Sequence, residues 1–432
     1  MPRAPVASLA PVASLAPVAP LAPLALIAPI RTPIGKFGGA LAPLSAADLG
    51  TAAVAACLER AGVAATAIDQ VVFGHARQAG GGPNTARQIA FRAGVPVDRP
   101  AYTVNQACGS GLQAVLCAAR AILLGEADLA LAGGTESMSN TPYLLPRARR
   151  GYRLGHDEIV DGMYRDGFCD PLSDLVMGET AEELAAERGI GRAASDAWAA
   201  TSQQRCEAAR GNGRFTPEIV PVTVPDRRGE RTVAEDEHPR SGVTAESLAR
   251  LPTVFRDGGT VTAGNASGIT DGAAAILVAS AAKARELGRE PAAWLLDWEV
   301  VGVEPRIMGI GPVPAVERLL ERRGLDGGEI DQVELNEAFA SQVLACLEEL
   351  PFDRRRVNPD GGAIPLGHPI GATGARLLVT LVHGLAARDG RLGIATLCVS
   401  GGMGLAALVA RREPEGAGGP AETGESGERP TS

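Results

Sequence analysis

Aromatic side chains are scarce in this sequence and make up only 3% of its 432 residues. A core with so few aromatic rings must rest on Ala, Val, Leu and Ile, and 45% of all residues are hydrophobic. Glycine is abundant by contrast, with 54 residues, which favours tight turns and close backbone contacts over long helical bundles. The length exceeds what one hydrophobic core usually supports, so we expect two or three domains.

The sequence also lacks an excess of positive charge and any paired-cysteine motif. Its formal net charge is −9, which argues against a nucleic-acid partner because phosphates are bound by basic surfaces. The seven cysteines include no C-x-x-C pair, so we expect neither a disulfide framework nor a metal site. Free thiols and a cytoplasmic location fit this composition.

Uninterrupted apolar runs are missing at the ends of the chain. The first 24 residues are rich in Ala, Pro and Leu, and the sequence APVASL occurs at 4–9 and again at 10–15. Each proline costs ~3 kcal/mol inside a helix, so no membrane span is expected. We predict a disordered extension at 1–24, with an atypical targeting segment as the alternative. The Gly-, Glu- and Pro-rich segment 413–432 is predicted to be disordered too.

Between these ends, short apolar segments alternate with amphipathic ones. This alternation predicts an α/β fold in which helices cover both faces of a parallel sheet. The segments typical of buried strands are 24–30, 68–76, 101–107 and 129–137, and those typical of helices are 46–62, 84–94 and 111–127.

Two short sequences recur in the same order along the chain. IDQV occurs at Ile68–Val71 and at Ile330–Val333, and in both places it enters a predicted strand. CGSG at Cys108–Gly111 is repeated as CVSG at Cys398–Gly401. Each cysteine follows a predicted strand and precedes a glycine-containing apolar segment that we interpret as a helix. The repeat predicts a duplicated α/β domain, interrupted by a different, charged segment at about 140–250.

Cys108 is the first candidate for chemistry because it lies at a predicted strand-to-helix turn. Such turns expose side chains at the carboxyl edge of the sheet, and a helix N-terminus lowers a thiol pKa from about 8.5 to roughly 3.5–7.5. Gly109 and Gly111 would let a substrate reach the sulfur. The alternative is a buried structural cysteine, which is what we expect of the cysteines in helical segments: Cys57, Cys117, Cys206 and Cys346.

Three further residues have a setting that suits catalysis. His368 lies in the Gly- and Pro-rich loop 361–374, and histidine exchanges protons with a thiol near neutral pH; the alternative is a surface histidine. Asn336 ends a predicted strand, where it could orient a water molecule, donate to an oxyanion or cap the next helix. Cys398 could converge with Cys108 on one pocket or form a disulfide with it.

These segments together resemble the thiolases, also called acetyl-CoA acetyltransferases or 3-ketoacyl-CoA thiolases. The resemblance covers about 25–411, nearly the whole chain between its two ends. The motifs that carry it occur in family order: RTPIGKFGG (31–39), NQACGSGLQA (105–114), GGTESMS (133–139), TAGNASGITDGAA (262–274), NEAFA (336–340), GGAIPLGHPIGATGAR (361–376) and LCVSGGMG (397–404).

The resemblance implies a duplicated, five-layered αβαβα fold of thiolase type with an inserted loop domain. Its N-terminal domain would comprise 25–140 and 251–290, its C-terminal domain 291–412, and the CoA-binding loop domain 141–250. It also implies cleavage of 3-oxoacyl-CoA by CoA, or the reverse Claisen condensation of acetyl-CoA. Coenzyme A is then a substrate, no separate cofactor is needed, and a homotetramer built as a dimer of dimers is expected.

The resemblance assigns a role to each candidate catalytic residue. His368 draws the proton from Cys108, which accepts the acyl group, and Cys398 moves the proton next to the thioester. Asn336 holds a water that, with His368, stabilises the enolate oxygen. A second oxyanion hole uses the backbone N–H groups of Cys108 and Ser400; the family has glycine at position 400, where this chain has serine.

The substrate-binding residues are likewise implied by the resemblance. Val176 stands where short-chain biosynthetic thiolases often have histidine, so a longer or different acyl chain is plausible. Two alternatives remain open: a β-ketoacyl synthase, which lacks a second catalytic cysteine, and a non-catalytic acyl-CoA-binding protein. The positions that match the family's contacts to CoA and the acyl chain are Arg227, Ser267, Ala263, Met177, Met308 and Phe339.

Overall fold

The computed structural model describes residues 21–227 and 229–414. The two ends that were predicted to be disordered lie almost entirely outside these residues.

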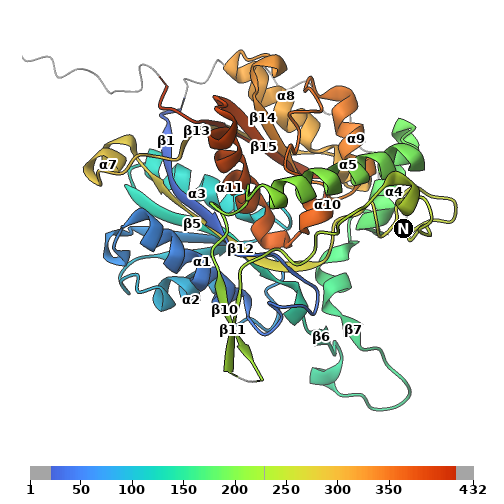
Figure 1. Cartoon of the computed structure of the whole chain (residues 1–432). Helices are drawn as coiled ribbons and strands as arrows, with labels where there is room; N and C mark the ends of the chain where they lie inside the picture. Colours follow the sequence, from blue (N-terminus) through green and yellow to red (C-terminus); the bar gives the residue numbers. More distant parts are fainter. Residues whose placement is uncertain (1–20, 228, 415–432) are drawn as a thin grey trace, which may run out of the picture.

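A mixed sheet of ten strands runs through the protein (Figure 1), in the order β14-β15-β16-β13-β1-β12-β5-β3-β4 with β2 paired to β12. Strand β1 joins the two halves because it pairs with β12 on one side and β13 on the other. The strands are β1 (Leu24–Arg31), β2 (Gly35–Lys36), β3 (Gln70–Gly74), β4 (Ala101–Val104), β5 (Leu129–Ser137), β12 (Thr270–Ala279), β13 (Ala293–Gly302), β14 (Gln332–Leu335), β15 (Leu392–Val399) and β16 (Met403–Ala410).

The prediction of a parallel sheet is only partly right. Strand β3 is parallel to β4 and β5, and β14 is parallel to β15. The strands β1, β12, β13 and β16 pair with their neighbours in the antiparallel sense. A continuous apolar run indicates burial on both faces but carries no information about strand direction, so the sequence pattern could not distinguish the two cases.

Helices cover and separate the two halves of the sheet in five layers, which confirms the predicted αβαβα arrangement (Figure 1). The central layer is α3 (Ser110–Leu123) and α11 (Ile370–Arg388), which pack against each other between the halves. The outer layers are α1 (Ala46–Ala61) and α2 (Thr85–Arg92) on the N-terminal half, and α8 (Pro312–Arg323) with α9 (Ala340–Glu349) on the C-terminal half.

The central helices approach each other closely at Gly111. A Cβ atom there would lie 2.8 Å from the backbone nitrogen of Ala375 and 2.9 Å from the carbonyl oxygen of Gly371. Gly111 therefore permits the contact between α3 and α11, and the expectation that it opens a path to Cys108 is wrong.

By length and composition α11 is the one described helix that could cross a membrane, but 83% of its apolar window is buried inside the protein.

The segment after Cys398 is a strand, and the helix expected there is absent from the described structure. Cys398 lies inside β15, and the chain reverses at Gly401 and Gly402, whose φ angles are 84° and 82°. These left-handed conformations suit glycine, so the pair forms the turn into β16. The repeated tetrapeptides thus occupy different local structures in the two halves.

The predicted insertion forms small sheets and helices of its own. Helices α4 and α5 pack against α9 of the C-terminal half, and the buried Arg31 of β1 forms ion pairs with Glu218 at 2.7 Å and Asp236 at 2.7 Å. The remaining elements are β6 (Tyr143–Leu144), β7 (Val160–Asp161), β8 (Cys169–Asp170), β9 (Leu175–Val176), α4 (Met177–Arg188), α5 (Arg192–Gly211), β10 (Val222–Asp226), β11 (Gly229–Val233), α6 (Ala245–Leu248), α7 (Ala281–Glu286) and α10 (Ala363–Leu366).

Candidate active site

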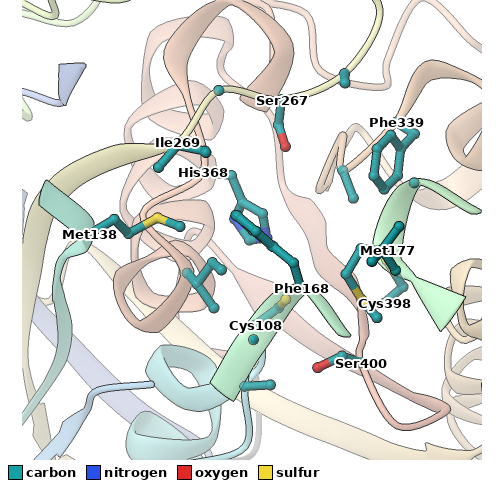
Figure 2. Close-up of a pocket in the computed structure, with 18 of the residues that line it drawn as sticks. Cys108, Met138, Phe168, Met177, Ser267, Ile269, Phe339, His368, Cys398 and Ser400 are labelled. Atoms are coloured by element: carbon teal, nitrogen blue, oxygen red, sulfur yellow. The ribbon is translucent and has the colours of Figure 1, made fainter. Parts of the chain in front are cut away.

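One cavity gathers most of the predicted site residues from segments that are far apart in sequence (Figure 2). Its wall combines the turn between β4 and α3, the loop before α11, the end of β15 and the start of α4. The predicted residues that line it are Cys108, His368, Cys398, Ser400, Ser267, Met177, Met308 and Phe339.

The turn that carries Cys108 is held in a strained conformation. Ala107 has a φ of 44°, which is unfavourable for a residue with a side chain. Its backbone N–H donates to Asn105 Oδ1 at 3.0 Å, and its carbonyl accepts from Ser110 Oγ at 2.6 Å. These bonds fix the turn so that the half-buried Cys108 side chain faces the cavity.

The expectation of a lowered Cys108 pKa is wrong. Burial among apolar groups raises the pKa of this thiol and outweighs the lowering influence of Arg77 and of backbone N–H groups. The backbone N–H groups of Ser400 and Cys108 lower this pKa less than Arg77 does. A neutral thiol in this setting needs a base before it can attack a substrate.

His368 is oriented as such a base. Its Nδ1 lies 2.7 Å from Thr373 Oγ1, and that hydroxyl donates its proton to the carbonyl of Pro369 at 3.0 Å. Nδ1 must therefore carry the ring proton, which leaves Nε2 as a proton acceptor. Nε2 is buried without a hydrogen-bond partner among the described residues. Burial, followed by the charges of Arg376 and Arg77, lowers the His368 pKa to about 3, so the ring is neutral at physiological pH.

Removing the hydroxyl that orients His368 should slow the reaction. In Thr373→Val, Nδ1 loses its acceptor and the ring loses its preferred tautomer, so we expect kcat to fall by about 10- to 100-fold. Thr373→Ser keeps the hydroxyl and should stay within a few-fold of the wild type. Steady-state rates of both variants test this, and equal rates for the two would contradict the assigned orientation.

Cys398 faces the same cavity from β15 and is 1% exposed. Burial raises its pKa well above the usual value, and Cys108 adds to this effect. All seven cysteines are free thiols, so the alternative of a disulfide with Cys108 is wrong.

Ser400 does not have a positive φ. Its backbone conformation therefore does not require glycine, and serine can supply the backbone N–H at this position.

Asn336 does not line the cavity, although Ala338 and Phe339 of the same segment do. Its side chain is fully buried, and neither Oδ1 nor Nδ2 has a partner among the described residues. The helix that follows starts at Ala340 with Phe339 as its N-cap, so the helix-capping interpretation is wrong. An unpaired buried amide of this kind typically binds an ordered water.

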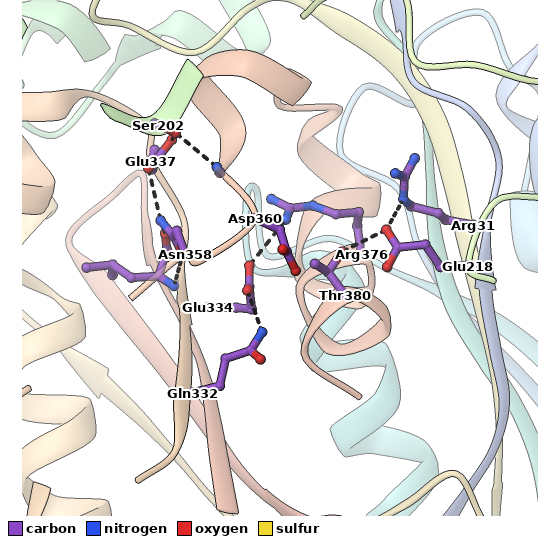
Figure 3. A network of polar contacts seen from close by, with 12 residues as sticks. Arg31, Ser202, Glu218, Gln332, Glu334, Glu337, Asn358, Asp360, Arg376 and Thr380 are labelled. Atoms are coloured by element: carbon purple, nitrogen blue, oxygen red, sulfur yellow. Dashed lines mark hydrogen bonds and ion pairs between the residues drawn. The ribbon is translucent and has the colours of Figure 1, made fainter. Parts of the chain in front are cut away.

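The neighbouring Glu337 fixes this segment in place (Figure 3). Its Oε2 accepts from Ser202 Oγ at 2.7 Å and from the backbone of Ile364 at 3.1 Å. Its Oε1 accepts from Trp198 Nε1 at 3.0 Å and from Asn358 Nδ2 at 3.0 Å. The Asn336–Phe339 segment is thereby tied to α5 and to the chain around α10, which makes its position rigid.

Two predicted binding residues lie outside the cavity. Ala263 lines an adjacent hollow, and Ala266 belongs to both walls, so the two spaces adjoin. Arg227 is exposed at the tip of the β10–β11 hairpin and lines neither space.

Several residues that line the cavity were not predicted from the sequence. Arg77 follows β3 at the carboxyl edge of the sheet, as Cys108 follows β4. Because α/β sheets bind ligands at this edge, the position of Arg77 could have identified it from the sequence. The apolar side chains come from separate loops whose sequences carry no signal of their own. They are Met138, Tyr164, Phe168, Phe255, Ile269 and Ile370.

Two family models match this chain: the thiolase N-terminal domain over residues 24–282 and the thiolase C-terminal domain over residues 289–411. An acetyl-CoA acetyltransferase of Pseudomonas aeruginosa is 50% identical over 382 residues, which cover 88% of this chain and 97% of that protein.

Solved structures show the same similarity. The crystal structure of Bacillus anthracis acetyl-CoA acetyltransferase aligns with a TM-score of 0.88 at 43% identity, covering 90% of this chain and 99% of that one. Human mitochondrial 3-ketoacyl-CoA thiolase in complex with CoA aligns with a TM-score of 0.87 at 40% identity, covering 90% and 98%.

Proposed function

This chain belongs to the thiolase family, and from that premise we propose that it cleaves 3-oxoacyl-CoA thioesters with CoA through an acyl group on Cys108. The observation that carries the proposal is the convergence of Cys108, His368 and Cys398 on one cavity. A thiol, a neutral imidazole and a second thiol are the groups that nucleophilic attack and proton transfer require.

The residues divide the reaction into two stages. His368 Nε2 takes the proton of Cys108, and the sulfur attacks the 3-oxo carbon while the N–H groups of Cys108 and Ser400 stabilise the oxyanion. The bond between C2 and C3 then breaks, and Cys398 protonates the enolate to release acetyl-CoA. In the second stage free CoA gives its thiol proton to Cys398 and attacks the acyl-cysteine. The bond between the acyl carbon and Cys108 breaks, His368 returns its proton to the Cys108 sulfur, and the shortened acyl-CoA leaves. The reverse sequence is the condensation of acetyl-CoA.

Asn336 supports the enolate although it does not line the cavity. We propose that its unpaired amide holds the water that shares this oxyanion with His368. A buried amide without any partner would be costly, and one water would satisfy it. The adjoining hollow lined by Ala263 is proposed to hold part of CoA, next to Ser267 in the reactive cavity. Arg227, which lines neither space, is proposed to contact CoA near its adenine and phosphate end.

The acyl group would rest on an adaptable apolar wall. Val176, Met177, Met308 and Met138 line the cavity, and methionine side chains adjust easily to ligands of different shape. The similarity to proteins named acetyl-CoA acetyltransferase favours acetyl transfer, whereas Val176 and this wall favour tolerance of longer chains. We therefore propose activity on acetoacetyl-CoA that extends to somewhat longer 3-oxoacyl-CoA substrates.

CoA-dependent cleavage of 3-oxoacyl-CoA substrates from four carbons upward tests the proposal. The loss of substrate is followed by absorbance and the products are identified by mass spectrometry. We expect acetyl-CoA and an acyl-CoA shortened by two carbons to appear in equal amounts. Absence of cleavage at every chain length would overturn the proposed function.

A further inference from the structure

The reactive cavity contains one permanently charged side chain. Among the lining residues that the structure describes, Arg77 is cationic, and the others are apolar or neutral at physiological pH. Arg77 is only 7% exposed. It forms no ion pair with any described carboxylate: Nη1 donates to the carbonyl of Asp166 at 3.1 Å, and the buried Nε has no partner.

The guanidinium is held in place by the segment that covers Cys108. A Cβ atom at Gly167 would lie 1.7 Å from Arg77 Nη2, so only glycine leaves room for it there. The guanidinium carbon lies 6.0 Å from the ring centre of Phe168. Phe168 and Cys108 in turn pack against the same apolar cluster, which places the cation close to the reacting sulfur.

Hydrogen bonds also tie the loop of Arg77 to the two reactive loops. Asn105, which fixes the turn of Cys108, donates to the carbonyl of Ala76 at 3.1 Å. The carboxylate of Glu136 accepts from the backbone of Arg77 at 3.1 Å and from Gly371, at the start of α11, at 2.9 Å. The positions of Arg77, Cys108 and His368 are therefore coupled through one rigid frame.

The thiolate, the tetrahedral oxyanion and the enolate of the proposed reaction are anions, and the cation that the reaction creates is the protonated ring of His368. Anions are poorly stabilised in an apolar cavity unless a counter-charge is present. We propose that Arg77 is the counter-charge for the anionic sulfur and oxygen atoms that form at Cys108. It acts through space and not as an acid or base, so it is a positioning and electrostatic residue.

The other titratable groups around Cys108 do not supply this charge. Arg77 has the largest lowering influence on the pKa of Cys108. It also lowers the pKa of His368, which keeps the ring neutral before proton transfer but makes it a weaker base. Glu136 opposes ionisation of Cys108, and Cys108 in turn raises the pKa of Cys398. Glu136 already accepts hydrogen bonds from three backbone N–H groups and lies 3.1 Å from His75 Nε2.

The test measures the pH dependence of Cys108 alkylation by iodoacetamide, with the modified peptide identified by mass spectrometry. In Arg77→Met, which keeps an unbranched apolar stem without the charge, we expect alkylation of Cys108 at pH 8 to fall by about tenfold. Arg77→Lys should remain within about threefold of the wild type. Reaction of the exposed Cys169 in the same samples is the internal control and should not change.

Gly167→Ala provides an independent variant if Arg77→Met fails to fold, because it displaces the guanidinium without removing it. It should slow Cys108 alkylation in the same direction. An unchanged pH profile in a folded Arg77→Met or Gly167→Ala protein overturns the inference. So does a loss of thiolysis confined to substrates with a carboxylate on the acyl chain, which would make Arg77 a substrate-binding residue instead.

The inference rests on the proposed function, but the two can fail separately. Alkylation needs no CoA substrate, so a shifted profile in a protein that cleaves no 3-oxoacyl-CoA would refute the proposed function and leave the role of Arg77 in place. An unshifted profile in a protein that does cleave 3-oxoacyl-CoA would refute the role of Arg77 and leave the proposed function in place.

Discussion

Replacing Cys108 by alanine should reduce CoA-dependent cleavage of acetoacetyl-CoA by about 10⁴-fold or more, because the reaction loses its nucleophile. The fold should survive, since the side chain is only half-buried and contributes little to the central core. Steady-state cleavage measured over a range of enzyme concentrations gives the residual rate.

Two further variants serve as controls for this result. Cys108→Ser keeps the shape of the side chain but is a much weaker nucleophile, so it should be nearly as inactive as alanine. Cys169→Ala removes an exposed thiol that does not line the cavity, and it should retain wild-type activity. Substantial thiolysis by either Cys108 variant would show that another group carries the acyl chain.

Replacing Cys398 by alanine should have a different effect on the two stages. Condensation of acetyl-CoA should fall by about 10²- to 10⁴-fold, the usual contribution of a general acid or base. Transfer of an acetyl group between acetyl-CoA and labelled CoA needs no proton at the methyl carbon and should fall by less than about tenfold. Rates of acetoacetyl-CoA formation and of label exchange separate the two effects.

Cys398 lies in an apolar cluster with Met308 and Phe339, so alanine there also leaves a small cavity. Cys398→Ser fills most of that space and provides the matched control: it should keep the folded structure yet remain poor in condensation. Normal condensation by Cys398→Ala would mean that the proton is removed by another base, and His368 would be the group to examine.

Much of the fold follows from local sequence patterns. Apolar segments at 129–137 and 394–397 predict strands because they are short, apolar and flanked by turns, and the repeated IDQV and C-x-S-G segments predict the duplication. Strand direction does not follow, because burial on both faces gives the same pattern in either sense. The hairpin after Cys398 was missed for a related reason: an alanine-rich apolar run suits a helix, and only pairing with β15 makes it a strand.

Site residues could be predicted where their role follows from the neighbouring sequence. They could not be predicted where their role depends on packing against distant segments. Cys108 and His368 stand out because a reactive side chain follows a strand or lies in a glycine-rich loop. The raised pKa of Cys108 could not be predicted, since its cause is burial by distant segments such as the loop of Phe168. Arg77 was missed because an arginine after a strand is normally solvated, and its burial becomes visible only when Gly167 lies across it.

The most direct test of the account is the location of the acyl group. Wild-type protein and Cys398→Ala are mixed with acetyl-CoA, quenched in acid and digested, and the acetylated peptide is identified by mass spectrometry. The account predicts one acetyl group on the peptide that contains Cys108 in both proteins, and none in Cys108→Ala. Acetylation of the Cys398 peptide in the wild type, or loss of the adduct in Cys398→Ala, would contradict the division of labour between the two cysteines.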